Sequence, residues 1–350
     1  MMSEILKRTL LICCYLVVFC CAVCSQKTTG RVHAVIISGG MNKLMNHERY
    51  WNDCAFLYRT LREVYQIPQQ DITLLISDGG EAGRDMLLAD GSGFASSPAD
   101  LDGDGERDVW LPATLQQVEA SLTELAARLT PDDRLLLFLT DHGGTDNGQQ
   151  AYAWMWGSQR LYDTQLAQLL DAFHVASMSI VLGMCNAGWF INHLQRENRV
   201  IATSCTGDEQ SWECRDRAYD EFVYHWTCAI AGRDSDGNSI NSDANGDGYI
   251  SMAEAFDYAR QHDRREETPQ YCSTPATLGD GWTLSPFSND GMLDSPQTEH
   301  SRTAQCYDLQ GREIPIHIAT KRRNAQIVYA KQSAGRSSIM IIKPSRIWRR

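Results

Sequence analysis

The sequence has 350 residues, of which 43% are hydrophobic and 22% charged, the composition of an ordinary globular protein. A chain of this length can bury the core of one large domain and leaves room for a smaller appended unit. The formal net charge of −12 argues against a nucleic-acid partner and favours solubility or cation binding.

Residues 1–25 have the features of a secretory signal peptide. Lys7 and Arg8 precede a short apolar run from Leu10 to Val23, and small residues follow it. The run lacks a stop-transfer flank, so we expect no stable membrane span in the mature chain. Lipoprotein processing at a cysteine of this segment is the alternative. We therefore expect an exported protein that is periplasmic, attached to the cell surface or secreted.

Strand-like and helix-like patterns alternate over residues 30–288, which we interpret as the main domain. Continuous apolar runs between turn residues predict buried strands, and apolar spacings of three and four predict helices. This alternation predicts an α/β fold, a three-layer α/β/α sandwich with a mostly parallel central sheet. The expected strands are 31–38, 71–77, 135–139, the run before Cys185 and 200–204; the expected helices are 47–65, 112–129, 163–173, 193–196 and 219–231, with a surface insertion at 78–108 and a hairpin at 151–161.

The C-terminal part differs in composition from the main domain. Residues 289–303 are polar, proline-containing and aperiodic, which predicts a linker. Residues 304–350 are basic and carry two β-patterned runs, which predict a small β module. Its first residues, Cys306–Arg312, resemble the sorting domains of the Por (type IX) secretion system. The simpler alternative is a small β cap on the main domain.

Two chemically active residues follow two of the predicted buried strands. Leu135–Leu139 leads into Asp141-His142-Gly143, and the apolar run from Ser179 leads into Cys185. The carboxyl ends of parallel strands meet at one edge of the sheet, so His142 and Cys185 are expected to face each other. His142 would activate the thiol, and the backbone amides of Gly143 and Cys185 would stabilise an oxyanion. Either residue alone fits a buried core position, but together they favour a cysteine hydrolase.

Seven cysteines follow the signal segment. If Cys185 is the nucleophile, six remain that an oxidising compartment would allow to pair. A bond between Cys205 and Cys214 would close a loop near the expected site. None of these seven cysteines forms a Cys-x-x-Cys pair that would suggest zinc.

These motifs resemble those of the legumains, the asparaginyl endopeptidases of clan CD. Phe138–Gly144 resembles their catalytic-histidine motif, and the strand before Cys185 resembles their nucleophile motif. The resemblance extends from His33 to about Trp226, and more loosely to Phe287. It implies a caspase-like fold, catalysis by His142 and Cys185, and protein or peptide substrates. No organic cofactor is expected.

By position, Arg49, Ser211 and Asp220 fall where legumains line the pocket for the residue before the cut. An arginine and an aspartate together would suit a neutral amide side chain, which both donates and accepts hydrogen bonds. The chain departs from the legumain pattern at Gly183, where legumains carry a glutamate, and at Asn186, where they carry an acid. These departures leave a preference for basic or small residues as an alternative. Without the resemblance, Arg49 and Asp220 would be interpreted as solvated surface residues.

The segment Asp243–Glu254 fits every calcium-ligand position of an EF-hand loop, with Gly248 at the sharp turn. We expect a structural calcium ion here and an exiting helix over Met252–His262. Loops 100–111 and 234–238 carry only the early ligands, and in the first of them Leu111 occupies the position of the bidentate acid. A bound cation and a cation-free turn both remain open for these two loops. The expected ligands of the complete loop are Asp243, Asn245, Asp247, the Tyr249 carbonyl, Ser251 and Glu254.

The sequence therefore predicts an exported, calcium-binding, legumain-like cysteine endopeptidase that cleaves after asparagine. Two alternatives use the same catalytic residues: a clan CD peptidase that prefers arginine or lysine, with Asp220 as the charge partner, and a transpeptidase. The alternative from another class is a non-catalytic, calcium-dependent binding protein on a peptidase scaffold.

Overall fold

A computed structural model describes residues 30–148 and 150–285, together with four short strands nearer the C-terminus. The chain forms two compact units, residues 1–296 and 297–350. The predicted signal peptide at 1–25 and the predicted linker at 289–303 lie outside the described residues. Within the described ranges, no helix has the length and apolar character needed to cross a membrane.

A six-stranded sheet forms the middle layer of the first unit, in the order β11-β10-β9-β5-β1-β2. Neighbouring strands from β10 to β2 are parallel, and the edge strand β11 runs antiparallel to β10. This arrangement confirms the predicted α/β fold with a mostly parallel sheet. The strands are β1 (Val32–Ser38), β2 (Ile72–Ile76), β5 (Arg134–Thr140), β9 (Ser177–Gly183), β10 (Arg199–Thr203) and β11 (Gln270–Thr274).

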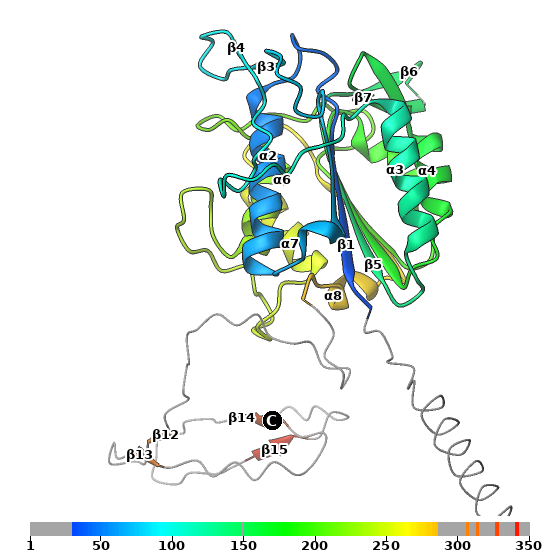
Figure 1. Cartoon of the computed structure of the whole chain (residues 1–350). Helices are drawn as coiled ribbons and strands as arrows, with labels where there is room; N and C mark the ends of the chain where they lie inside the picture. Colours follow the sequence, from blue (N-terminus) through cyan, green and yellow to red (C-terminus); the bar gives the residue numbers. More distant parts are fainter. Residues whose placement is uncertain are drawn as a thin grey trace, which may run out of the picture. The chain divides into compact units, whose positions relative to one another are not determined.

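Helices cover both faces of this sheet, which gives the predicted three layers (Figure 1). One face packs against α2, α6 and α7, and the other against α3 and α4, with the short α5 beside α4. Short helical segments complete the connections. The bounds are α2 (Glu48–Arg59), η1 (Thr60–Val64), η2 (Gln69–Asp71), α3 (Leu115–Arg128), α4 (Asp163–Asp171), η3 (Ala187–Phe190), α5 (Ile191–Leu194), α6 (Glu221–Ala231), α7 (Met252–His262) and α8 (Leu278–Gly281).

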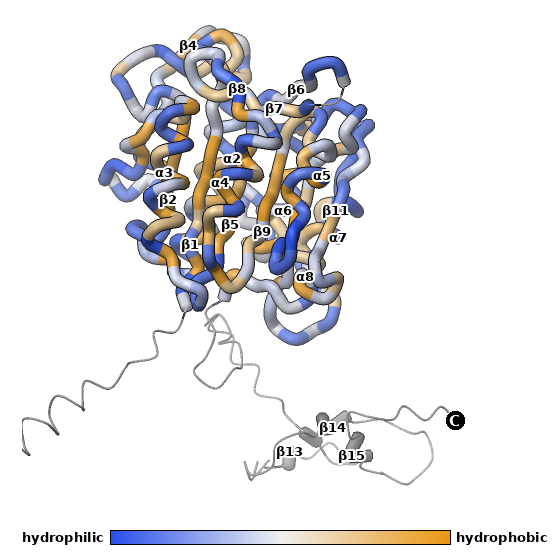
Figure 2. Tube along the Cα trace, turned by 90° about the vertical axis from the view of Figure 1, so that its right-hand side faces the viewer, coloured by the Kyte–Doolittle hydropathy of each residue, from blue (hydrophilic) through white to orange (hydrophobic). Residues whose placement is uncertain are grey.

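The two faces explain why the central residues of the strands are apolar without interruption. In β1, Ala34 and Ile36 belong to the cluster under α2, α6 and α7, whereas Val35 and Ile37 belong to the cluster under α3 and α4. Successive side chains of a strand point to opposite faces, so a strand covered on both sides favours apolar residues on both faces. Figure 2 shows these central strands as the most hydrophobic part of the trace.

Local signals set the ends of several helices. The Thr114 side chain accepts a hydrogen bond from the Gln117 amide and caps α3, and Ser251 with Glu254 forms a capping box at the start of α7. Gly232 ends α6 in the left-handed conformation, with φ of 64°. The predicted helix over 47–65 is α2 followed by the π-helical turn η1.

Smaller sheets lie beside the central one. The predicted hairpin at 151–161 is β7 (Gln150–Met155) with β8 (Gln159–Tyr162), and β6 (Gly143–Asp146) adds a third strand that was not expected. The insertion at 78–108 contains the hairpin of β3 (Met86–Leu87) and β4 (Phe94–Ala95). In the second unit, the antiparallel pairs are β12 (Cys306–Tyr307) with β13 (Glu313–Ile314), and β14 (Gln326–Val328) with β15 (Met340–Ile342).

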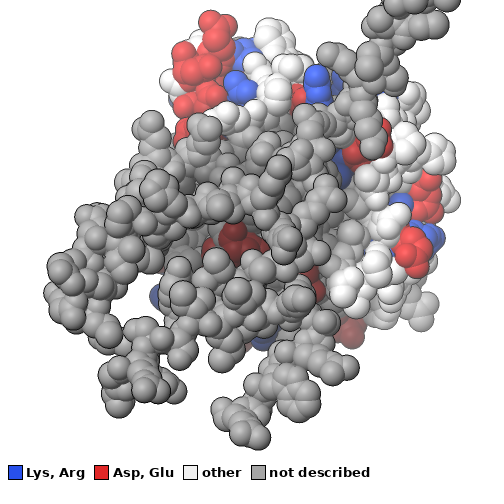
Figure 3. Space-filling model, turned by 90° about the horizontal axis from the view of Figure 1, so that it is seen from below, with Lys and Arg blue, Asp and Glu red and all other residues white. Residues whose placement is uncertain are grey.

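The described surface seen from below carries separate groups of acidic side chains with single basic side chains among them (Figure 3). The opposite end of the first unit holds the carboxyl ends of the parallel strands. The chain passes from β1 outward to β2 and then crosses back to β5 on the other side of β1. Such a reversal of strand order leaves a crevice at the carboxyl ends of the two inner strands.

Candidate active site

His142 and Cys185 lie at the same edge of the sheet, at the carboxyl ends of two adjacent strands. Thr140, the last residue of β5, is paired with Gly183, the last residue of β9, and each active residue follows two positions later. Gly143 packs so closely on the nucleophile's backbone that a Cβ there would collide with the Cys185 carbonyl oxygen. The structure therefore brings together all three residues that the sequence predicts as catalytic.

The imidazole of His142 is oriented by a backbone carbonyl. Its Nε2 lies 3.0 Å from the carbonyl oxygen of Met45, and because a carbonyl only accepts, Nε2 carries the proton of the neutral ring. The rings of His47 and Tyr50 contact it edge-on, with centroid distances of 5.4 and 5.2 Å. Burial, assisted by the charge of Arg49, lowers the pKa of His142 to about 4. The ring is therefore neutral above this pH, with Nδ1 able to accept a proton.

Cys185 is a half-buried free thiol. The Ser211 amide donates to its Sγ at 3.4 Å, which would stabilise a thiolate. Burial nevertheless raises the pKa of the Cys185 thiol, and the negative charges of Asp220 and Glu267 raise it further. The resting site thus combines an uncharged thiol with an uncharged imidazole, so the proton has to move when the thiol attacks.

A buried aspartate fixes the loop that carries the histidine. The Asp141 carboxylate accepts hydrogen bonds from the amides of Gly40 and His142, both at 2.6 Å. It therefore ties the end of β1 to the end of β5. Burial raises the pKa of Asp141 to about 8, although these amides oppose the shift.

Arg49 and Asp220 form a buried ion pair at the position predicted for substrate recognition. Nε of Arg49 donates to Asp220 at 2.7 Å, while its two terminal nitrogens contact Glu213 at 3.1 Å and the Tyr50 hydroxyl at 2.9 Å. Asp220 is 6% exposed. Arg49 uses three of its five N–H donors in these bonds, so two remain to meet a substrate. Ser211 is not part of this pair and lies against the thiol.

A second carboxyl group supports the ion pair from within the core. Asp53, one helical turn after Arg49 on α2, shares the Thr140 hydroxyl with Asp220, at 3.2 Å from each. Burial and the charge of Asp220 raise the pKa of Asp53 well above its usual range. Asp53 is therefore the protonated member of the two, and the negative charge stays on Asp220 beside Arg49.

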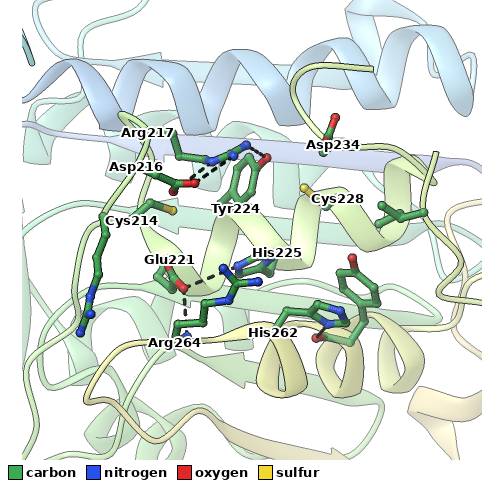
Figure 4. A pocket seen from close by; sticks show the side chains of 13 residues that line it. Cys214, Asp216, Arg217, Glu221, Tyr224, His225, Cys228, Asp234, His262 and Arg264 are labelled. Atoms are coloured by element: carbon green, nitrogen blue, oxygen red, sulfur yellow. Dashed lines mark hydrogen bonds and ion pairs between the residues drawn. The ribbon is translucent and has the colours of Figure 1, made fainter. Parts of the chain in front are cut away.

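Two cavities flank the segment 214–217. A cavity of about 430 Å³ adjoins Arg49 and Glu213, and Leu87 and Leu88 of the insertion line its wall. The other, of about 370 Å³, is shown in Figure 4, where Glu221 and His225 of α6 project into it. The first cavity has room for an amino-acid side chain next to the ion pair.

The two departures from the legumain pattern have structural reasons. A Cβ at Gly183 would collide with a methyl group of Val223 on α6, so a glutamate does not fit without a shift of that helix. Asn186 has φ of 61°, a left-handed conformation that asparagine tolerates, and its side chain donates to the Gly207 carbonyl at 2.7 Å. Gly183 thus allows α6 to pack closely on the sheet, and Asn186 serves the local backbone.

Sequence reasoning missed several residues of this site. The Met45 carbonyl is a backbone group and leaves no side-chain signal. Asp53 could have been found, because it is an acid on the apolar stripe of α2 at the i+4 position from Arg49. Glu267, which lies in the connection from α7 to β11, is far from the motifs in sequence. Cys205 and Cys214, considered as a disulfide, are free thiols.

The Asp243–Glu254 loop is closed on itself by its acidic side chains. The Asp243 carboxylate accepts hydrogen bonds from the amides of Gly246 and Gly248 at 2.7 and 2.9 Å. The Glu254 carboxylate reaches back to the amide of Ala244 at 3.0 Å, across the start of the loop. The predicted exiting helix is α7. The side chains of Asp243 and Glu254, the first and last ligands of the EF-hand pattern, are therefore both fixed by hydrogen bonds to the backbone of the loop.

The two less complete loops differ from each other. In loop 100–111, carboxylate oxygens of Asp100, Asp102 and Asp108 lie within 4.8 Å of one another. Asp108 accepts a hydrogen bond from the Tyr58 hydroxyl at 2.6 Å, and the Leu111 carbonyl accepts from β2. In the other loop, Asp234 accepts hydrogen bonds from the amides of residues 236 and 238, which makes a turn.

A thiol and a neutral imidazole at adjacent strand ends, beside backbone amides, are the parts of a cysteine peptidase site. Consistent with this class, the sequence model of the Peptidase C13 family matches residues 116–277, a range that includes His142, Cys185, Ser211 and Asp220. The match confirms the resemblance to the legumain family and supports a clan CD cysteine peptidase. Arg49 lies outside the matched range.

Two other comparisons add no functional argument. No curated protein sequence matches the chain. Among solved structures, the crystal structure of protein GSU0716 from Geobacter sulfurreducens is similar, with a TM-score of 0.40 and 12% sequence identity; the match covers 71% of this chain and 97% of that one.

Proposed function

We propose that the protein is a legumain-like cysteine endopeptidase in which Cys185 is the nucleophile and His142 the general acid and base. The observation that carries this proposal is the placement of both residues at the ends of β5 and β9, with Nε2 of His142 bonded to the Met45 carbonyl. That bond leaves Nδ1 as the basic nitrogen of the ring.

The reaction follows from these protonation states. Nδ1 of His142 takes the thiol proton of Cys185 as Sγ attacks the carbonyl carbon of the scissile bond. Backbone amides of Gly143 and Cys185 stabilise the oxyanion that forms. The protonated imidazole then gives its proton to the leaving amine, and a thioester remains on Cys185. A water molecule, deprotonated by His142, cleaves the thioester and frees the thiol.

The charge balance of the pocket favours asparagine before the cut. Arg49, Arg215 and Arg217 line the adjoining cavity against only Glu48 and Glu213, so a basic side chain would add to an excess of positive charge there. A carboxamide can accept from a remaining Arg49 donor and give its own N–H groups to Glu213 or Asp220. The adjoining cavity of about 430 Å³ has room for it.

Covalent trapping of the thiol tests this function without a natural substrate. A peptidyl chloromethyl ketone with asparagine at its reactive end should alkylate Cys185, as read by mass spectrometry of the digested protein. The His142→Ala variant should be modified much more slowly. Equal labelling of the two proteins would contradict the catalytic role of His142. Faster labelling by a ketone with lysine in place of asparagine would contradict the preference for asparagine.

We also propose that the Asp243–Glu254 loop binds a structural calcium ion. The carboxylates of Asp243 and Glu254 already hold the loop in a closed form, and Gly248 has the positive φ, 87°, that a sharp turn requires. A bound calcium ion would offset the repulsion among these acids and fasten the loop to α7. Calcium-dependent heat release in titration calorimetry, absent in an Asp243→Ala variant, is the expected result; a flat titration of the native protein would contradict it.

Export is part of the same proposal. A basic start, a short apolar run and small residues before position 26 support cleavage of a signal peptide. The N-terminal sequence of the protein recovered from outside the cytoplasm should begin near Gln26. Recovery of the intact N-terminus in the cytoplasm would contradict this proposal.

A further inference from the structure

Ser211 and Trp212 form a wall beside the Cys185 thiol. This wall is hydrogen-bonded to the carboxyl group of Glu267, which takes no part in the catalytic steps. The Ser211 amide donates to Sγ of Cys185 at 3.4 Å, and the next amide, that of Trp212, donates to Oε2 of Glu267 at 3.1 Å. The carboxyl group of Glu267 therefore anchors the backbone at Trp212, the residue next to the one whose amide touches the thiol.

Glu267 is paired with a second acid. Its Oε1 and Oδ2 of Asp263 are both buried, and neither accepts a hydrogen bond from an N–H or hydroxyl group of the described residues. The two carboxyl groups act on each other's pKa: Asp263 raises that of Glu267, and Glu267 lowers that of Asp263. Two ionised carboxylates only accept hydrogen bonds and would repel each other, so one proton on the pair stabilises it. The two buried oxygens without a donor therefore indicate a pair that holds one proton.

The same connection is attached to the wall at a second point. Glu209, just before the wall residues, accepts hydrogen bonds from the amide and hydroxyl of Thr268, both at 2.9 Å. The Arg265 guanidinium lies over the Trp212 ring, 5.2 Å from its centroid. The connection from α7 to β11 thus contacts this wall, and Glu209 just before it, at several points.

Several charged and titratable groups face the pair from the surrounding elements. Burial, followed by the charge of Asp263, raises the pKa of Glu267 to about 9. On α6, Glu221 lies between His225 and the Arg264 backbone, as Figure 4 shows. The charges of Glu221 and His225 act on the pKa of Asp263. The charge of Glu267 in turn raises the pKa of the Cys185 and Cys205 thiols.

We propose that Glu267 is a positioning residue for Cys185, acting through Ser211 and Trp212, and that its proton-sharing pair with Asp263 sets an alkaline limit on the reactivity of the nucleophile. The proposal rests on the proposed function, because it takes Cys185 as the reacting thiol. While the proton is shared, the pair carries a single negative charge and holds the wall. Loss of that proton places two negative charges side by side, which separates the carboxyls and disfavours the Cys185 thiolate.

Three variants separate positioning from charge. Glu267→Gln keeps the shape, accepts from Trp212 through its oxygen and donates to Asp263 through its nitrogen, but does not ionise. Glu267→Ala removes both contacts. Glu266→Gln is the matched control, since Glu266 is an exposed neighbour with the same charge. Thermal unfolding of each variant reports whether it folds.

Hydrogen exchange tests positioning without any need for activity. The amides of Ser211 and Trp212 should exchange at least about tenfold faster in Glu267→Ala than in the native protein. Their exchange rates should be unchanged in Glu267→Gln and Glu266→Gln. If the enzyme turns over peptides, kcat/KM should fall about tenfold in the alanine variant only. Unchanged exchange in Glu267→Ala would overturn the positioning role, whether or not any peptide is cleaved.

Alkylation of the thiol tests the alkaline limit. The rate of iodoacetamide modification at Cys185, followed by peptide mapping against pH, should reach half its maximum at lower pH in Glu267→Gln than in the native protein. The Glu266→Gln control should follow the native curve. Coincident curves for Glu267→Gln and the native protein would overturn the charge effect. Absence of peptide turnover in every protein, with these differences present, would reject the peptidase function and leave the support of the wall in place.

Discussion

The pKa of His142 gives the sharpest prediction for the activity. Burial and Arg49 lower that pKa to about 4 from the ordinary value of 6.5. A general base has to be unprotonated, so kcat/KM should fall on the acid side only as the pH approaches 4. At about pH 5, a group with the lowered pKa is about 90% unprotonated, whereas one with the ordinary value is about 3% unprotonated. Relative activity at this pH should therefore be about thirtyfold higher than a solvated histidine would allow.

The assay combines kinetics with a direct titration of the ring. Initial rates at substrate concentrations below KM give kcat/KM against pH, and the ring proton resonances of His142 in the Cys185→Ala variant report its own protonation. Both should show a midpoint near 4. An acid limb and a ring titration that both lie near pH 6.5 would refute the argument from burial. An acid limb near 4 with a ring midpoint near 6.5 would assign the limb to another group.

Three further changes have effects that follow from individual contacts. Removal of calcium present at about 100 times its Kd should lower the free energy of unfolding by about 2.7 kcal/mol and Tm by about 5 °C, and an unchanged Tm in chelator would count against the Asp243–Glu254 site. Gly183→Ala should destabilise the fold by about 1–3 kcal/mol in chemical unfolding, and Val223→Ala should restore part of the loss; no loss in the single variant would contradict the close packing. Arg49→Lys should lower kcat/KM about tenfold, because an ammonium group does not make the three directed bonds of the guanidinium; native kcat/KM would exclude a role in recognition.

The central sheet was predictable because its signal is local. β1, β5 and β9 are buried at every position and apolar without interruption through their central residues, a pattern that burial on both faces favours. β11 (Gln-Tyr-Cys-Ser-Thr) escaped prediction because it is an edge strand, half-buried throughout, with no alternation. β6 escaped because its glycines indicate a loop; Gly143 is there to allow the backbone to approach Cys185, not to make a turn.

The site was predictable where a reactive side chain follows a buried strand. His142 and Cys185 could be placed together from this rule alone, although 43 positions separate them in the sequence. The groups that tune them leave weaker signals. The Met45 carbonyl has none, and Glu267 reaches the site only because the connection after α7 folds back onto the loop after β10. Long-range contacts of this kind depend on the assembled fold.

The most direct test of the account is peptide turnover as a function of the residue before the cut. Fluorogenic peptides that differ only at this residue, carrying asparagine, aspartate, arginine, lysine or alanine, would be compared with calcium present, from acid to neutral pH. The Cys185→Ala variant is the blank. We predict turnover above the blank, with the highest kcat/KM for asparagine. Fastest cleavage after arginine or lysine would contradict the role given to the Arg49–Asp220 pair, and no turnover above the blank would contradict the peptidase function.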